Sequence, residues 1–73
     1  HMLGAAGAVE LIVTLEMMKR QEVVATRNLV NIDPRCAGAN LIKENLSVKM
    51  DTILKNNFAL GGVNTSLVIR RYT

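Results

Sequence analysis

The stretch MDTILKNNFALGGVNTSLVIRRY, residues 50–72, decides the fold. Two runs in it, Met50 to Asn56 and Val63 to Tyr72, are rich in the β-branched and apolar residues that favour strands. Between them lies Phe58-Ala59-Leu60-Gly61-Gly62, where the paired glycines supply the φ freedom that a tight reversal needs. The pattern therefore predicts an antiparallel β-hairpin.

Before the hairpin, the chain from Leu3 to about Arg20 has no proline and is rich in helix formers, so it predicts one helix. The first part, Leu3 to Ala8, is small and apolar on every side, and we expect it to be buried all round. An apolar stripe at helical spacing predicts that the second part is amphipathic. The members of this stripe are Ala8, Leu11, Ile12, Leu15 and Met18.

The middle of the chain gives weaker signals. Glu22 to Ile32 mixes β-branched with polar residues and predicts extended chain, and Asp33-Pro34 predicts a turn. The stretch Ala39 to Leu46, with the apolar pair Leu41-Ile42, favours a brief edge strand. No repeat or linker divides the sequence, so residues 1–73 are predicted to form a single α+β segment. Its order is one N-terminal helix, extended chain and a C-terminal antiparallel β-hairpin.

Length and cysteine content indicate that the chain needs a partner. A chain of 73 residues buries only roughly 60% of its unfolded surface on folding. The single cysteine, Cys36, cannot form an intramolecular disulfide. We therefore expect a buried piece of something larger.

Composition argues against several classes of partner and ligand. The basic residues are scattered and the aromatic residues are Phe58 and Tyr72 alone, which argues against nucleic-acid binding. No apolar run approaches the ~20 residues of a membrane span, and no secretory signal is present. A cytoplasmic location is the resulting expectation. No residue spacing suggests a metal site, and no cofactor is expected.

Two glycine-rich stretches carry a resemblance to a known family. One is His1-Met2-Leu3-Gly4-Ala5-Ala6-Gly7, and the other is Asn56-Asn57-Phe58-Ala59-Leu60-Gly61-Gly62-Val63-Asn64. They resemble two active-site motifs of the β-ketoacyl-acyl-carrier-protein synthases, Gly-His-x-x-Gly-Ala-Ala-Gly and Asn-Ser-Phe-Gly-Phe-Gly-Gly-x-Asn. The resemblance covers essentially the whole chain but only the C-terminal segment of such an enzyme. It implies the end of a thiolase-type α/β layered fold.

The same resemblance implies a function and partners. The parent enzyme would catalyse decarboxylative Claisen condensation of an acyl thioester with malonyl-acyl-carrier protein, in fatty-acid or polyketide synthesis. Its partners would be acyl-carrier protein, acyl thioesters and the remainder of the condensing-enzyme fold, with a dimeric parent. Two alternatives stay open. One is a non-catalytic, chain-length-factor-like or truncated subunit that pairs with a condensing enzyme, and the other is a small independent interaction module.

Three residues acquire roles from the resemblance. His1 is similar in place to the histidine that donates a hydrogen bond to the thioester carbonyl oxygen, and the adjacent helix dipole favours its neutral form. The backbone N–H of Leu60 corresponds to an oxyanion donor. The Leu60 side chain corresponds to the gate over the acyl pocket, with Phe58 as a further substrate-binding residue. A histidine before a methionine is also what a common cloning site leaves behind, so both origins of His1 stay open.

The chain departs from the family pattern in the second motif. The usual Phe-Gly-Phe is Phe58-Ala59-Leu60, so the aromatic lid is lost and Ala59 requires either negative φ or a costly left-handed conformation. The reactive cysteine of the family lies outside this segment. Cys36 follows the predicted turn, and we interpret it as a free cysteine. The chain alone is therefore expected to be inactive.

Overall fold

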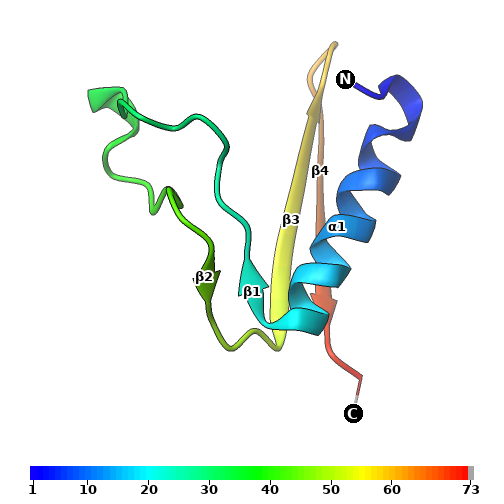
Figure 1. Ribbon diagram of the computed structural model, residues 1–73. Helices are drawn as coiled ribbons and strands as arrows, with labels where there is room; N and C mark the ends of the chain where they lie inside the picture. Colours follow the sequence, from blue (N-terminus) through cyan, green and yellow to red (C-terminus); the bar gives the residue numbers. More distant parts are fainter. Residues whose placement is uncertain (73) are drawn as a thin grey trace.

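A helix lies along one face of a long two-stranded hairpin in the computed structural model, which describes residues 1–72 (Figure 1). The chain opens with a 3₁₀ turn, Leu3–Ala5, and continues as helix α1, Ala6–Arg20. Strands β3, Thr52–Ala59, and β4, Val63–Arg70, pair antiparallel. One helix with antiparallel strands confirms the predicted α+β class.

The hairpin turn is tighter than the sequence predicts. The register runs from Thr52 opposite Arg70 to Ala59 opposite Val63, so the turn is Leu60-Gly61-Gly62. Gly61 and Gly62 have φ of +87° and +81°, values that glycine adopts without steric cost. Because Ala59 continues the ladder, it needs no left-handed conformation, and the expected strain at this position is absent.

The start of the helix is exposed, so the prediction that residues 3–8 are buried all round is wrong. Leu3 is 79% exposed, and nothing lies within 4 Å of the positions that a Cβ would take on Gly4 and Gly7. Leu3 also has a left-handed φ of +51°. The small residues permit close approach of a neighbour, but the hairpin tip stands on one side of this turn and no other described segment covers it.

The helix buries only part of the predicted apolar stripe: Met18 is buried and Leu11 is half-buried, but the other members are exposed. Thr14 and Met18 are buried, whereas Ile12 is 62% exposed and Leu15 is 44% exposed. The face of β3 that is half-buried is mixed, with Ile53 beside Lys55 and Asn57, so apolar and polar helix positions are buried together. The Thr14 hydroxyl is satisfied inside the helix, where it donates to the Glu10 carbonyl at 2.8 Å.

Gln21 joins the end of α1 to the entry of β3. It adopts the left-handed conformation (φ 54°) that ends the helix, and its backbone N–H donates to the carbonyls of Met17 and Met18. Its side-chain Nε2 donates to the Met18 carbonyl at 2.6 Å and to the Met50 carbonyl at 2.8 Å. The Met50 N–H donates in return to Gln21 Oε1 at 2.8 Å. The carboxamide therefore pairs with Met50 as a strand residue would.

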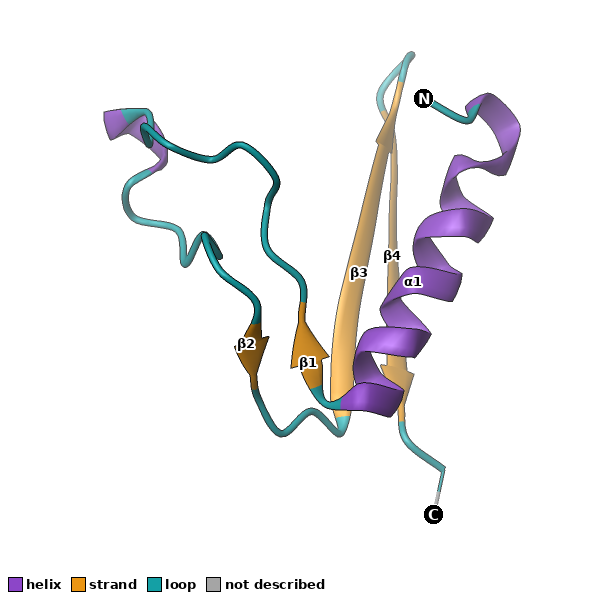
Figure 2. Cartoon of the chain, in the orientation of Figure 1, coloured by secondary structure: helices purple, strands orange, loops and turns teal. Residues whose placement is uncertain are grey.

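Residues 24–45 form an arm that reaches away from the helix and hairpin (Figure 2). Its base is a two-residue antiparallel pair of β1, Glu22–Val23, with β2, Leu46–Ser47. The edge strand predicted within Ala39 to Leu46 is displaced: the observed strand β2 begins at Leu46, the last residue of that stretch, where the chain pairs with β1, and the apolar pair Leu41-Ile42 is outside it. Most of the predicted extended stretch 22–32 is irregular, with a turn in which Leu29 N–H donates to the Thr26 carbonyl at 3.3 Å.

The predicted turn at Asp33-Pro34 is present as a 3₁₀ turn, Pro34–Cys36, at the far end of the arm. Asp33 Oδ1 accepts from the Arg35 N–H at 2.9 Å, and the Arg35 guanidinium also donates to the carboxylate. The side-chain hydrogen bond with Arg35, followed by the backbone one, lowers the pKa of Asp33, and the same contact raises the pKa of Arg35.

The outer face of the hairpin is bare. Side chains alternate along a strand, so the face opposite Lys55 and Asn57 carries Leu54, Phe58 and Val68, which are 63%, 77% and 67% exposed. In the described part of the chain, no helix is long and apolar enough to cross a membrane.

Candidate functional site

An open groove of about 1020 Å³ lies between the start of the helix and the tip of the hairpin. Two segments far apart in the sequence line it. One comprises residues 1–3, 6, 7, 9 and 10, and the other comprises residues 56–60. The structure therefore brings His1, Phe58 and Leu60, the three site residues predicted from the sequence, to one place.

The ring of His1 is oriented by the backbone. Its Nδ1 accepts a hydrogen bond from the Leu3 N–H at 2.8 Å. A backbone amide can only donate, so this Nδ1 carries no proton and the ring proton lies on Nε2. The imidazole in this arrangement is neutral, and its Nε2–H is the donor left for another group.

Leu60 lies at the hairpin tip, one residue beyond the last ladder pair. Its side chain is fully exposed. Within residues 1–72, no acceptor is found for its backbone N–H, and the turn is closed instead by the Gly62 N–H, which donates to the Ala59 carbonyl at 3.3 Å. Phe58 lines the groove from β3. The tip thus offers a free backbone donor beside an apolar surface.

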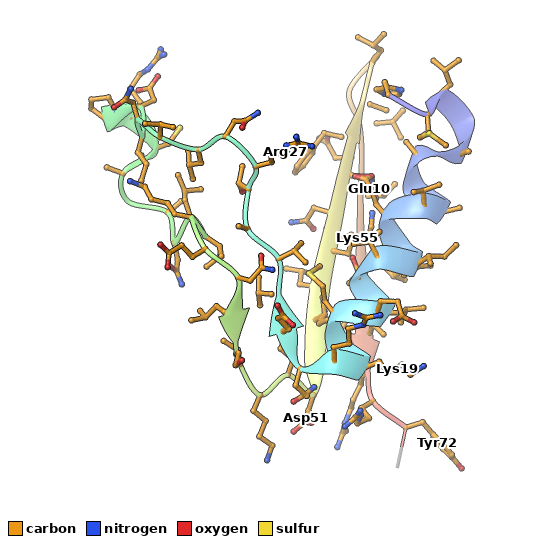
Figure 3. The ribbon with its side chains drawn as sticks, in the orientation of Figure 1. Glu10, Lys19, Arg27, Asp51, Lys55 and Tyr72 are labelled. Atoms are coloured by element: carbon orange, nitrogen blue, oxygen red, sulfur yellow. The ribbon has the colours of Figure 1, made fainter. Side chains whose placement is uncertain are left out.

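Lys55, Asn57 and Glu10 form a polar cluster beside the groove, which was not predicted from the sequence. Asn57 Nδ2 donates to Glu10 Oε2 at 3.0 Å, Lys55 Nζ lies 3.8 Å from the same oxygen, and Lys55 also donates to Asn57 Oδ1. Figure 3 shows Glu10 on α1 and Lys55 on β3 facing each other. The signal available in the sequence was the period-two spacing of Lys55 and Asn57, which places both on one face of the strand.

Other candidate groups lie elsewhere. Cys36 is exposed, lies in the 3₁₀ turn of the arm and does not line the groove. Within the described residues, no three His, Cys, Asp or Glu side chains are placed to hold a metal ion. The chemistry that the groove offers is therefore hydrogen-bond donation from His1 and Leu60, with no nucleophile beside them.

A 3-oxoacyl-[acyl-carrier-protein] synthase 1 from Buchnera aphidicola is 36% identical over 72 residues, which is 99% of this chain and 18% of that protein. A synthase 2 from Coxiella burnetii is 38% identical over 71 residues, 97% of this chain and 17% of that protein. The crystal structure of a β-ketoacyl synthase from Burkholderia phymatum matches with a TM-score of 0.90 and 45% identity, over 96% of this chain and 17% of that one.

The resemblance to the β-ketoacyl synthases is confirmed. The thiolase-type origin of the α+β segment is confirmed with it, because the structural match extends over nearly all of this chain. No protein-family model matches. The chain spans about a fifth of the length of these synthases. Its position at their C-terminal end stays a prediction.

Proposed function

We propose that residues 1–73 are a single segment, the C-terminal part of a β-ketoacyl-acyl-carrier-protein synthase. The parent enzyme would join an acyl thioester to malonyl-acyl-carrier protein by decarboxylative Claisen condensation. The observation that carries this proposal is the meeting of His1 and Leu60 in one groove, although their motifs lie at opposite ends of the chain. The relatives are named as synthases, which favours a catalytic parent over a non-catalytic, chain-length-factor-like subunit.

The proposed role of His1 follows from its proton. Loss of carbon dioxide from the malonyl group leaves an electron pair that is delocalised onto the thioester carbonyl oxygen as an enolate. The His1 Nε2–H, held by the contact of Nδ1 with the Leu3 N–H, is a fixed neutral donor for that oxygen. Donors already aimed at developing negative charge stabilise the transition state without reorganisation.

Leu60 serves the second half of the proposed reaction. The enolate carbon attacks the acyl thioester held on a cysteine that the rest of the enzyme supplies, and the acyl oxygen becomes an oxyanion before the thiolate leaves. The free N–H of Leu60 is proposed as one donor to that oxyanion. The Leu60 side chain and Phe58 are proposed to contact the acyl chain, since both line the groove.

The exposed apolar surface of the hairpin is evidence for a large protein partner. Leu54 and Val68 expose apolar surface on the outer side of the hairpin, and apolar faces of sheets are normally covered by another layer. We infer that the remainder of the condensing-enzyme fold supplies that layer. The parent is further proposed to be a cytoplasmic dimer that acts on acyl-carrier protein and acyl thioesters, and binds neither nucleic acid nor a membrane.

A decarboxylation assay on the full-length protein that carries this segment tests the proposal. We expect His1→Ala to lower decarboxylation of malonyl-acyl-carrier protein by about 10²- to 10³-fold, the usual effect of losing one such donor. His1→Asn retains a neutral N–H donor and should lose less. Cys36→Ser, away from the groove, is the matched control and should leave the rate unchanged. An undiminished rate in His1→Ala would remove the basis of the assignment.

A further inference from the structure

Lys55 is a nearly covered lysine that the proposed reaction does not use. Its side chain is 11% exposed and extends from β3 toward Glu10 on α1 (Figure 3). An ammonium group so covered is costly unless acceptors replace its water. Glu10 Oε2, at 3.8 Å, and Asn57 Oδ1 are those acceptors.

Lys55, Asn57 and Glu10 form a closed polar triangle. The Asn57 carboxamide uses both ends, since Oδ1 faces the ammonium and Nδ2 donates to Glu10 Oε2 at 3.0 Å. A flipped amide would set its NH₂ group against an ammonium that only donates, and its oxygen against a carboxylate that only accepts. The charge on Lys55 therefore fixes how Asn57 holds Glu10.

This polar triangle is also where the helix is tied to the hairpin. Among the described residues, no other side-chain hydrogen bond or ion pair joins α1 to β3 or β4. The other attachment of α1, through Gln21 and Met50, lies near the opposite end of the helix. The contacts of the triangle therefore fix the groove end of α1 against β3. Glu10 and Asn57 both line the groove.

We propose that Lys55 is a positioning residue for the groove, acting through Asn57 and Glu10. It holds the start of α1, which His1 precedes, in register with the hairpin tip that carries Leu60. The inference rests on the proposed function, because it requires that the reaction depend on the separation between the two proposed donors, His1 and Leu60. Catalytic groups displaced by about 1 Å lose on the order of 10²-fold in rate, so a contact that only sets separation has a large effect.

The test compares three variants of the full-length protein that carries this segment. Lys55→Met keeps the aliphatic stem and removes the charge, and we expect kcat for condensation to fall by about 10-fold or more with KM nearly unchanged. Lys55→Arg keeps the charge and should recover most of kcat. Lys49→Met removes an exposed lysine outside the groove and should behave as wild type. A Lys55→Met variant with wild-type kcat, or an arginine variant no better than it, would overturn the proposal.

A second measurement separates this inference from the proposed function. Melting temperatures of Lys55→Met, Asn57→Ala and the double variant form a double-mutant cycle that requires no activity. We expect non-additive effects, since each change breaks the same triangle, whereas additive effects would refute the triangle. If the wild-type protein catalyses no condensation but the cycle shows coupling, the function fails and the polar triangle stands.

Discussion

Leu60 has two proposed roles, one for its backbone N–H and one for its side chain. Its backbone N–H is independent of the side chain, and its side chain is fully exposed at the mouth of the groove. Replacing the side chain therefore changes the shape of the groove without removing the donor. The last ladder pair, Ala59 with Val63, directly precedes the tip and fixes its position on the hairpin.

Leu60→Phe in the full-length protein should shift acyl-chain preference more than it changes decarboxylation. A larger side chain alters the space available to the acyl chain, while the backbone donor remains. Relative condensation rates across a series of acyl chain lengths, set beside the decarboxylation rate of malonyl-acyl-carrier protein, measure the two effects. An unchanged chain-length profile would count against a gating role for this side chain.

At the scale of elements, the side chain of Gln21, at the end of α1, replaces a strand residue as the hydrogen-bond partner of Met50. Its carboxamide exchanges two hydrogen bonds with the backbone of Met50, across a separation of 29 residues. These bonds fix where β3 begins relative to α1. The conformation itself is costly, because Gln21 is a non-glycine residue at φ 54°.

Gln21→Ala should lower the free energy of unfolding by about 1–3 kcal/mol, because Met50 loses its partners while the strained backbone remains. Gln21→Gly also loses the carboxamide but relieves the left-handed conformation, so it should be less destabilised than Ala by roughly 1 kcal/mol. Denaturant unfolding of the two variants beside wild type, in the full-length protein that carries this segment, checks both values. Equal stability of Gln21→Ala and wild type would show that the carboxamide bonds contribute nothing.

The helix and the hairpin could be predicted from the sequence because both depend on local composition. The helix has helix formers without proline, and the hairpin has runs of strand-forming residues on both sides of Gly61-Gly62. The buried face of the helix could be predicted only in part, since Met18 belongs to the predicted apolar stripe whereas the burial of the polar Thr14 depends on tertiary packing. The bounds and pairing of the short strands β1 and β2 could not be predicted either, because a two-residue pairing depends on chain segments that are distant in the sequence.

The candidate site divides in the same way. His1 and Leu60 were predicted from the resemblance of their two motifs to those of the β-ketoacyl synthases, and the structure places both in the groove. Lys55 was not predicted, because a lysine among polar residues is usually solvated and a single sequence does not reveal a covered one. Its position follows from the tertiary contact with Glu10 alone.

The molecule as a whole is expanded for its length. Its radius of gyration is 13.7 Å, against about 11 Å for a compact domain of this size. Met18 is the one buried apolar side chain among residues 1–72, and Ile12, Leu54 and Phe58 are largely exposed. A chain with so small a core is expected to depend on neighbouring layers for its order.

This chain by itself should catalyse nothing and should self-associate or lack fixed tertiary structure. Covalent acyl transfer needs a thiolate beside the donors, and Cys36 lies away from the groove. Incubation with acyl- and malonyl-carrier protein, together with sedimentation and thermal melting, tests both statements. Condensation that disappears in Cys36→Ser would overturn the account of the site, while a sharply melting monomer would contradict only the dependence on neighbouring layers.

The arm at residues 24–45 has an evolutionary consequence. Its base is fixed by the β1–β2 pair and by the bond of the Thr26 N–H with the Ile42 carbonyl, so its far end, around Cys36 and Gly38, can change length without moving the groove. Doubling a flexible loop costs only about 0.6 kcal/mol in closure entropy. Insertions and deletions among homologous chains should therefore accumulate there, and the same point offers a place to graft a reporter domain.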